Sequence, residues 1–277
     1  MIQDSQMNKV FLSDLLPTKA PRTCKHLKAV LDEWNVETNF IYGTKDIWCR
    51  DFMPIQAGAG RFQSYKYSPD YLADNKEYEL MTDGAPLLRD MGMPVDNMLR
   101  NVILDGGNVV RCGSKVVMTA KVLEENPGFR PYALLELLEA AFDADVILVP
   151  WDTNEEFGHA DGICRYVGDD TVLMTNYRQF DSDMADRFRK VLDCHFNVSE
   201  LNIDVPSLDR NSWAYINWLQ TDKVIVVPSV DSVSDQMAVE QIEVAIPSYK
   251  GHVILCPCPD LIPEGGGLNC CTWTVRE

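Results

Sequence analysis

Hydrophobic and polar positions alternate along the chain in a pattern that predicts a series of β-hairpins. In each hairpin, an apolar or β-branched run is followed by a short turn of Gly, Asp, Ser or Thr and then by a second such run. Four hairpins are predicted, at residues 52–67, 108–119, 163–177 and 214–228. Between them lie segments in which apolar residues recur every three or four positions, as on one face of a helix. These helices are predicted at residues 23–34, 76–91, 132–142, 183–195 and 235–246.

Each predicted helix leads into one more short strand, so that helix, strand, loop and hairpin repeat in the same order. These strands are predicted at residues 36–41, 101–104, 145–150, 198–205 and 252–257. Matching positions of neighbouring units, Asp51 and Asp105 or Asp183 and Asp235, are 54 and 52 residues apart. A fifth of the 277 residues is about 55, and a fixed period of this length indicates a repeat architecture. The pattern therefore predicts five units.

The fifth unit lacks a complete hairpin, because the sequence stops at Glu277 before a second strand. We expect residues 9–12 to supply the missing strand, which would close the five units into a ring and remove an exposed sheet edge. The predicted fold class is therefore α/β, with a single catalytic domain over residues 1–277. A doubly wound sheet is the alternative, but the abundance of hairpins argues against it.

The composition is that of a globular protein, with 46% hydrophobic and 24% charged residues. Its 42 acidic and 25 basic residues give a formal net charge of −17 at pH 7. A field of this sign repels polyanions, so we expect binding neither to nucleic acid nor to an anionic membrane. It attracts small cations instead, which favours a positively charged substrate.

The first residues and the cysteines both indicate a cytoplasmic protein. The first nine residues lack the basic and apolar stretches of a secretion signal, and no later run approaches the roughly 18 apolar residues of a membrane span. Nine cysteines, an odd number, are scattered through apolar segments, as expected for reduced thiols in a reducing compartment. The sequence leaves a monomer and a homo-oligomer both open.

The loops that enter successive hairpins carry the residues suited to chemistry. They contain Asp51, Asp105, the pair His159 and Asp161, Asn217, and the adjacent thiols Cys270 and Cys271. In a closed ring these loops meet at one end of the central axis. Carboxylates, a histidine and a thiol in one place provide the nucleophile, the base and the orienting group of covalent catalysis.

Other interpretations of the same residues stay open at this point. His159 and Asp161 also fit a half-buried polar pair without catalytic duty, and the glycine runs also fit tight packing. Cys256 and Cys258, in the sequence Cys-Pro-Cys-Pro, resemble a metal clip, although the prolines and the missing partner ligands favour a structural loop. No Cys-x-x-Cys or His-x-x-x-His spacing supports a zinc site.

Five motifs follow one another between Asp46 and Thr272. They are Trp-Cys-Arg-Asp at 48–51, Leu-Asp-Gly-Gly-Asn at 104–108, Gly-His-Ala-Asp at 158–161, Trp-Ala-Tyr-Ile-Asn at 213–217 and Gly-Gly-Gly-Leu-Asn-Cys-Cys at 265–271. In this order they resemble the motifs of the agmatine deiminase family, which includes bacterial peptidylarginine deiminases and belongs to the guanidine-modifying pentein superfamily. The resemblance implies a pentein fold, a five-bladed α/β propeller, in agreement with the repeat of hairpins and helices.

The resemblance also implies roles for residues within the motifs. Cys271 is implied as the nucleophile, His159 as the residue that handles protons, and Asp105 as the carboxylate that orients this histidine. Asp51 and Asp161 are implied to grip the substrate. The chemistry suits these types, because a guanidinium offers a planar fork of N–H donors that two carboxylates bind by charge-assisted hydrogen bonds.

Two further residues, Trp48 and Asn217, match positions of the family pattern. The resemblance implies that they contribute to substrate binding, Asn217 by lining the pocket or by holding the backbone. The implied reaction, in which a thiolate attacks the guanidinium carbon, requires no metal ion and no organic cofactor. The sequence departs from the family pattern at Asp105, where Glu is usual, and at Cys270, where His is common.

The implied activity is hydrolysis of a C–N bond in a linear amidine. A small cationic guanidine, with agmatine as first choice, would become a ureido product and ammonia, as in polyamine metabolism. Deimination of free or peptidyl arginine is the alternative among hydrolases, because no residue that recognises the rest of the substrate is identified. A non-catalytic pentein that binds a cationic ligand or a partner protein is the alternative of another class, and the combination of thiol, histidine and carboxylates argues against it.

Overall fold

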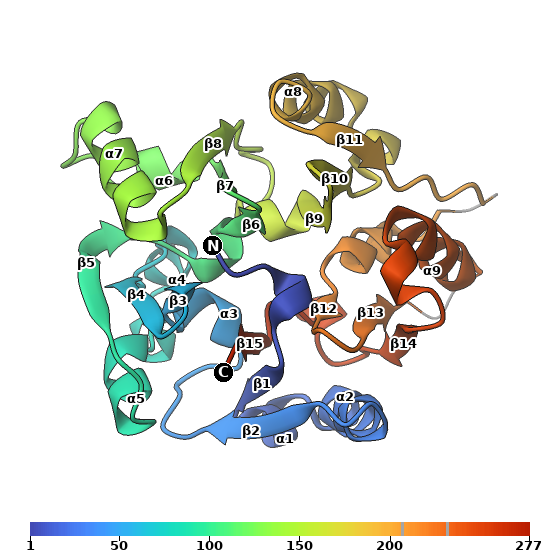
Figure 1. Ribbon diagram of the computed structural model, residues 1–277, viewed down its shortest axis with the longest axis horizontal. Coiled ribbons are helices and arrows are strands. Elements are labelled where there is room, and N and C mark those ends of the chain that lie inside the picture. Colours follow the sequence, from blue (N-terminus) through green and yellow to red (C-terminus); the bar gives the residue numbers. More distant parts are fainter. Residues whose placement is uncertain (206–207, 231–232) are drawn as a thin grey trace.

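Five three-stranded sheets surround a central axis in the computed structural model (Figure 1). The structure describes residues 1–205, 208–230 and 233–277. In each sheet the middle strand pairs with one neighbour antiparallel and with the other parallel. In sheet order the strands are β15 (Thr272–Val275), β1 (Lys9–Ser13) and β2 (Glu37–Ile41); β3 (Ile55–Gly58), β4 (Arg61–Lys66) and β5 (Asp96–Ile103); β6 (Val110–Cys112), β7 (Lys115–Thr119) and β8 (Asp145–Val149); β9 (Cys164–Gly168), β10 (Thr171–Met174) and β11 (Asn197–Glu200); β12 (Leu219–Gln220), β13 (Ile225–Ser229) and β14 (Val253–Pro257).

A helix connects the two parallel strands of each sheet and lies at the outside of the ring (Figure 1). Such a crossover is needed because parallel neighbours cannot be joined by a tight turn. The five helices are α2 (Pro21–Glu33), α5 (Gly84–Asp90), α7 (Pro131–Phe142), α8 (Ser182–Leu192) and α9 (Ser234–Ala245). Shorter helices, α1 (Leu16–Lys19), α3 (Cys49–Phe52), α4 (Asp70–Asp74) and α6 (Lys121–Glu124), lie in the loops.

The ring closes through the two ends of the chain. β1 pairs antiparallel with β15, from Lys9 opposite Val275 to Leu12 opposite Thr272. The prediction that residues 9–12 complete the fifth unit is therefore confirmed, and so is the predicted array of five units.

Several predicted elements differ in extent from those observed. The helix expected at residues 76–91 is divided into a 3-10 turn, η2 (Tyr78–Leu80), and α5. The Asp83 side chain caps α5 as a new helix by accepting from the amide of Ala85 at 3.1 Å. Pro86 then lies in the first turn of α5, where its missing N–H costs nothing. The hairpin expected from residue 214 begins later, because Arg210–Ile216 forms a 3-10 helix, η6, and β12 has only two residues.

Two of the single strands also differ. The strand expected at 101–104 is longer and begins at Asp96, whereas the strand expected at 198–205 ends at Glu200. Pairing with the neighbouring strand sets the length of both strands. β5 pairs with β4 in an irregular register, whereas only four residues of β10 pair with β11.

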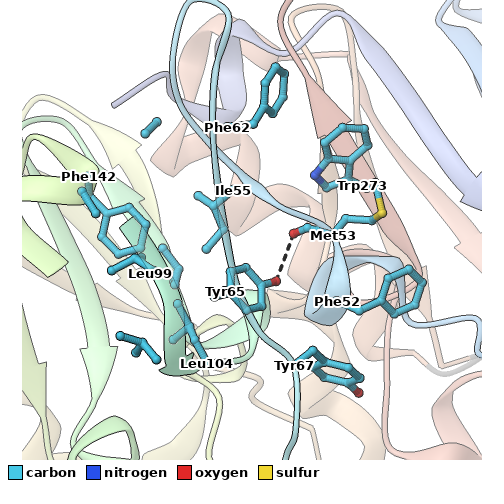
Figure 2. Packing of buried hydrophobic residues seen from close by; sticks show 14 of the residues in the cluster. Phe52, Met53, Ile55, Phe62, Tyr65, Tyr67, Leu99, Leu104, Phe142 and Trp273 are labelled. Carbon is cyan, nitrogen blue, oxygen red and sulfur yellow. Dashed lines mark hydrogen bonds between the residues drawn. The ribbon is translucent and has the colours of Figure 1, made fainter. Parts of the chain in front are cut away.

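Buried aromatic side chains from β4 and β15 hold the backbone around α3 (Figure 2). The Tyr65 hydroxyl lies within hydrogen-bonding distance of two carbonyl oxygens, those of Asp51 (2.6 Å) and Met53 (3.0 Å). Nε1 of Trp273 donates to the carbonyl oxygen of Pro54 at 2.9 Å. The core therefore fixes the main chain on both sides of Asp51.

A carboxylate from the first residues of the chain enters the arginine-rich centre of the ring. Asp4, in the 3-10 helix η1 (Asp4–Gln6), accepts from Arg111 and from Arg165, each at 2.7 Å. Both arginine side chains are buried, and they belong to β6 and β9. Burial raises the pKa of Asp4, but the two guanidinium groups outweigh it and lower this pKa to about 2.

Within the described ranges, no helix combines the length and the apolar character needed to cross a bilayer.

Candidate active site

The loops that were predicted to carry the chemistry meet at one end of the ring. Four of them contain a short helical turn, namely α3, η3 (Gly106–Asn108), η4 (Ala160–Gly162) and η6, and each turn contacts the next. The fifth is the glycine-rich segment 265–271 before β15, whose Cys270 carbonyl accepts from the amide of Arg50 in α3 at 3.0 Å. This bond closes the circle of loops.

His159 lies between two carboxylates. Its Nε2 is 2.9 Å from Oδ2 of Asp105, and its Nδ1 is 3.6 Å from Oδ1 of Asp51. The same Asp51 oxygen accepts from the amide of Gly107 at 3.0 Å. A Cβ at position 107 would lie only 2.6 Å from Nδ1 of His159 and 2.7 Å from Asp51, so this close approach requires glycine. The predicted grouping of Asp51, Asp105 and His159 is present.

Asp161 lies next to the glycine-rich segment. Its Oδ2 accepts from Nδ2 of Asn269 at 2.6 Å and lies 3.8 Å from the sulfur of Cys270. Oδ1 of Asn217 accepts from both the sulfur and the amide of Cys270, each at 3.2 Å. Asn217 and Asn269 therefore hold the thiol beside a carboxylate.

The thiol in this position is Cys270, which differs from the prediction of Cys271. The Cys271 side chain is fully buried in an apolar cluster with Cys24 and Cys256, and its sulfur faces the carbonyl oxygen of Leu268 at 3.6 Å. The turn formed by residues 267–272 directs the two adjacent side chains to different places. The assignment of Cys271 therefore has to be corrected, because its sulfur lies in the core rather than at the carboxylates.

Burial and mutual repulsion shift the protonation of these groups. Burial, with Asp105 and Asp161 nearby, raises the pKa of Asp51 to about 7, although His159 and a backbone N–H oppose this. Burial works against the protonated form of His159, but Asp51 and the hydrogen bond to Asp105 outweigh it and raise this pKa to about 10. The imidazole is therefore a cation at neutral pH.

Both adjacent thiols are held in their neutral form, for different reasons. Burial raises the pKa of Cys270 well above its usual range, and the charges of Asp161 and Asp51 raise it further. Burial also raises the pKa of Cys271, but the next causes are the thiols of Cys256 and Cys24. Of these two thiols, only Cys270 would have its pKa lowered by a cation that neutralises the two aspartates.

Trp48 lies directly against the glycine-rich segment 265–271. Its half-exposed ring packs on Gly266 so closely that a Cβ there would overlap the indole. The ring therefore borders the site from the side of α3, where a substrate-contacting residue was predicted.

Two residues of the site were missed from the sequence. The buried Arg50 side chain reaches the carbonyl oxygen of Asn269 and Oγ1 of Thr274, each at 3.3 Å. Asn269 itself binds Asp161. The position of both inside the quoted motifs was the available signal, but their partners are far away in sequence.

The Cys256 and Cys258 side chains are buried in the same apolar cluster as Cys271. Within the described residues, no group of three or more His, Cys, Asp or Glu side chains is arranged to hold a metal ion.

Comparison with known proteins matches nearly the whole chain to one family. The model of the Porphyromonas-type peptidyl-arginine deiminase family matches residues 7–275. An agmatine deiminase of Pseudomonas savastanoi pv. phaseolicola is 24% identical over an alignment of 212 residues that covers 62% of this chain. The matched part spans 57% of the length of that relative.

Solved structures share the fold. The agmatine deiminase of C. jejuni superimposes with a TM-score of 0.76 at 16% identity, over 100% of this chain and 95% of the other. An agmatine deiminase of Enterococcus faecalis gives a TM-score of 0.74 at 15% identity, over 100% and 95% of the two chains. The predicted pentein fold, a five-bladed α/β propeller, is thereby confirmed.

Proposed function

Because the chain belongs to the Porphyromonas-type peptidyl-arginine deiminase family, we propose that it hydrolyses a guanidinium compound to a ureido product and ammonia. The observation that carries the proposal is the thiol of Cys270 beside Asp161 and Asn217, in one cluster with Asp51 and His159. A protein that only binds a cation needs the carboxylates but not the thiol or the imidazolium, so the combination favours an enzyme.

Substrate binding falls to Asp51 and Asp161 in this proposal. Both carboxylates are nearly fully buried, and a guanidinium placed between them would form charge-assisted hydrogen bonds where water competes little. The bound cation offsets the two negative charges that raise the pKa of Cys270. Binding therefore favours the thiolate only when a substrate is present to be attacked, and the thiol proton passes to solvent.

The chemical steps follow from the protonation states. The Cys270 thiolate forms a bond to the central carbon of the guanidinium, and the His159 imidazolium donates a proton to the departing nitrogen, which leaves as ammonia. The remaining covalent thiouronium is attacked by water, from which the now neutral His159 removes a proton. The C–S bond then breaks and the remaining hydroxyl proton passes to solvent, which releases the ureido product and restores the thiolate. Asp105 keeps the imidazole oriented through its 2.9 Å contact with Nε2.

Agmatine is the first choice of substrate. It carries two positive charges toward a chain of net charge −17, whereas free arginine also brings a carboxylate. Two buried cations close to the site, Arg50 and Lys121, already bind the Asn269 carbonyl oxygen and Asp70, so neither favours a substrate carboxylate. The relatives that are named agmatine deiminases agree with this choice, whereas the description of the family names peptidyl-arginine, the substrate of the alternative.

The test is ammonia release from agmatine, arginine and a blocked arginyl peptide. We expect turnover that is highest with agmatine and is lost in Cys270→Ser, because a hydroxyl is a far weaker nucleophile than a thiolate at neutral pH. Turnover of the arginyl peptide alone would assign the substrate to the peptidyl class. Specific binding of agmatine without ammonia release from any guanidine would refute the enzyme and favour a binding protein.

A further inference from the structure

Lys121 is a buried cation beside the site that the proposed reaction does not use. It is the first residue of α6, and its side chain is only 1% exposed. An ammonium group is taken out of water in this way only where it is paired and hydrogen-bonded. Its partners therefore indicate what the lysine holds in place.

The Lys121 ammonium joins three segments of the chain. Nζ lies 2.7 Å from Oδ1 of Asp70 in α4 and donates to the carbonyl oxygen of Phe157, in the loop before His159, at 2.9 Å. Glu125, one turn after Lys121, is 3.6 Å away. Burial opposes the charge, but Glu125, Asp105 and Asp70 outweigh it and raise the pKa of Lys121, so the group stays a cation.

The two segments that Lys121 joins each bring an aromatic ring to His159. The centroid of the Tyr71 ring lies 6.2 Å from that of His159, and the centroid of Phe157 lies 6.1 Å from it. The Tyr71 and Phe157 rings also pack edge to face at 5.1 Å. Nζ of Lys121 is 5.1 Å from the centre of the Tyr71 ring, which adds a cation–π contact.

The aliphatic part of Lys121 also packs against the residue that precedes His159. Gly158 has φ +67°, and a Cβ there would lie 2.9 Å from Cδ of Lys121. The carbonyl oxygen of Gly158 accepts from Oγ1 of Thr119 at 2.6 Å. Lys121 therefore contacts Gly158, the residue before His159, as well as the Tyr71 ring and the Phe157 carbonyl oxygen.

We propose that Lys121 is a positioning residue, whose ammonium clamps Asp70 and the Phe157 carbonyl together and so holds Tyr71 and Phe157 against the imidazole of His159. The clamp rests on the proposed deiminase function, since it aligns the group that transfers protons. Misplacement of a catalytic group by about 1 Å costs on the order of 10²-fold in rate. The clamp should therefore affect turnover more than substrate binding, for which Asp51 and Asp161 remain.

The kinetic test compares Lys121→Met, which keeps the aliphatic stem, with Lys121→Arg, which keeps the charge. The matched control is Lys115→Met, because Lys115 also pairs with a carboxylate, Asp170 at 3.3 Å, but lies at the other end of β7. We expect kcat of Lys121→Met to fall roughly 10- to 100-fold with KM within about threefold, and Lys121→Arg and the control to stay near wild type. A kcat of Lys121→Met within about twofold of wild type would overturn the proposal.

Asp70→Asn decides the question if Lys121→Met does not fold. The Asp70 side chain is 43% exposed, so its neutral replacement stays solvated, and the buried Lys121 ammonium keeps Glu125, 3.6 Å away, as a charged partner. We expect a lower kcat at an unchanged KM, because one arm of the clamp is lost. An unchanged kcat would show that the segment carrying Tyr71 needs no clamp.

A second readout does not depend on activity. The chain has four histidines, and the Hε1 proton resonance of His159 can be assigned as the one missing from His159→Asn. Ring currents from Tyr71 and Phe157 displace it, so Lys121→Met should move it and Lys115→Met should not. An unmoved resonance would refute the clamp. Absence of ammonia release by the wild type would instead refute the deiminase function, while this shift would still test the clamp.

Discussion

Replacing Asp4 by Asn removes the carboxylate that joins two buried arginines at the centre of the ring. Arg111 and Arg165 each lose a charge-assisted hydrogen bond of 2.7 Å while remaining almost fully buried. They belong to the strands that follow η3, which begins directly after Asp105, and η4, which contains Asp161. The substitution therefore tests whether the first residues of the chain hold together the sheets that carry the site.

The pKa shift gives the size of the effect. The pKa of Asp4 is lowered from 3.8 to about 2 in the folded protein, and each unit corresponds to about 1.4 kcal/mol. The carboxylate then contributes about 2 kcal/mol to the free energy of unfolding. Because the folded-state pKa is the lower one, this contribution is present above pH 3.8 and is lost as the pH falls through about 2.

The assay is urea unfolding at pH 7, followed by a thermal scan. We expect Asp4→Asn to lower the free energy of unfolding by about 2 kcal/mol, or the unfolding temperature by about 4–8 °C for a chain of this size. The matched control is Asp222→Asn, because Asp222 forms a more exposed pair with Arg276 at 3.4 Å, and such pairs contribute about 0–1 kcal/mol. Equal losses in the two variants would refute the reasoning.

Three further predictions concern the site. Asp51→Asn and Asp161→Asn should each raise KM and lower kcat for the guanidine substrate, because a neutral amide attracts and aligns the guanidinium less well; variants with a lower unfolding temperature but full activity would make these residues mere supports. The kcat/KM of the wild type should rise with pH as Asp51 loses its proton at about 7, and fall as His159 loses its proton at about 10. In Asp51→Asn the rise of kcat/KM near pH 7 should be absent. A wild-type profile that is flat from about pH 5 to 8 would contradict this. The preference of kcat/KM for agmatine over arginine should shrink as the salt concentration rises from about 0.01 to 0.15 M and the Debye length falls from about 30 to 8 Å; a preference for arginine at low salt would contradict the choice of agmatine.

The order of the elements could be predicted because it depends on local signals. Turn residues such as Gly113 and the Gly168-Asp169-Asp170 run mark hairpins, and helical periodicity marks the segments between them. The length of a strand depends instead on the strand that it pairs with, and β11 and β12 are shorter than predicted for this reason. The helix boundary at Gly84 depends on a cap and a proline that periodicity alone does not weigh.

The site could be predicted as far as its loops carry motifs. Asp51, Asp105, His159 and Asp161 are brought together as expected. The choice between two adjacent cysteines could not be made in this way, because it depends on how the turn at residues 267–272 directs each side chain. The contacts of Lys121 were also hidden, since Asp70 and Phe157 are 51 and 36 residues away in sequence.

The central claim, that Cys270 is the nucleophile, is tested most directly by trapping the covalent intermediate. Wild type, Cys270→Ser and Cys271→Ser are mixed with agmatine, quenched in acid and digested, and the peptide that contains residues 270 and 271 is examined by mass spectrometry. The account predicts a thiouronium adduct and turnover in the wild type and in Cys271→Ser, and neither in Cys270→Ser. An adduct that persists in Cys270→Ser and disappears in Cys271→Ser would contradict it.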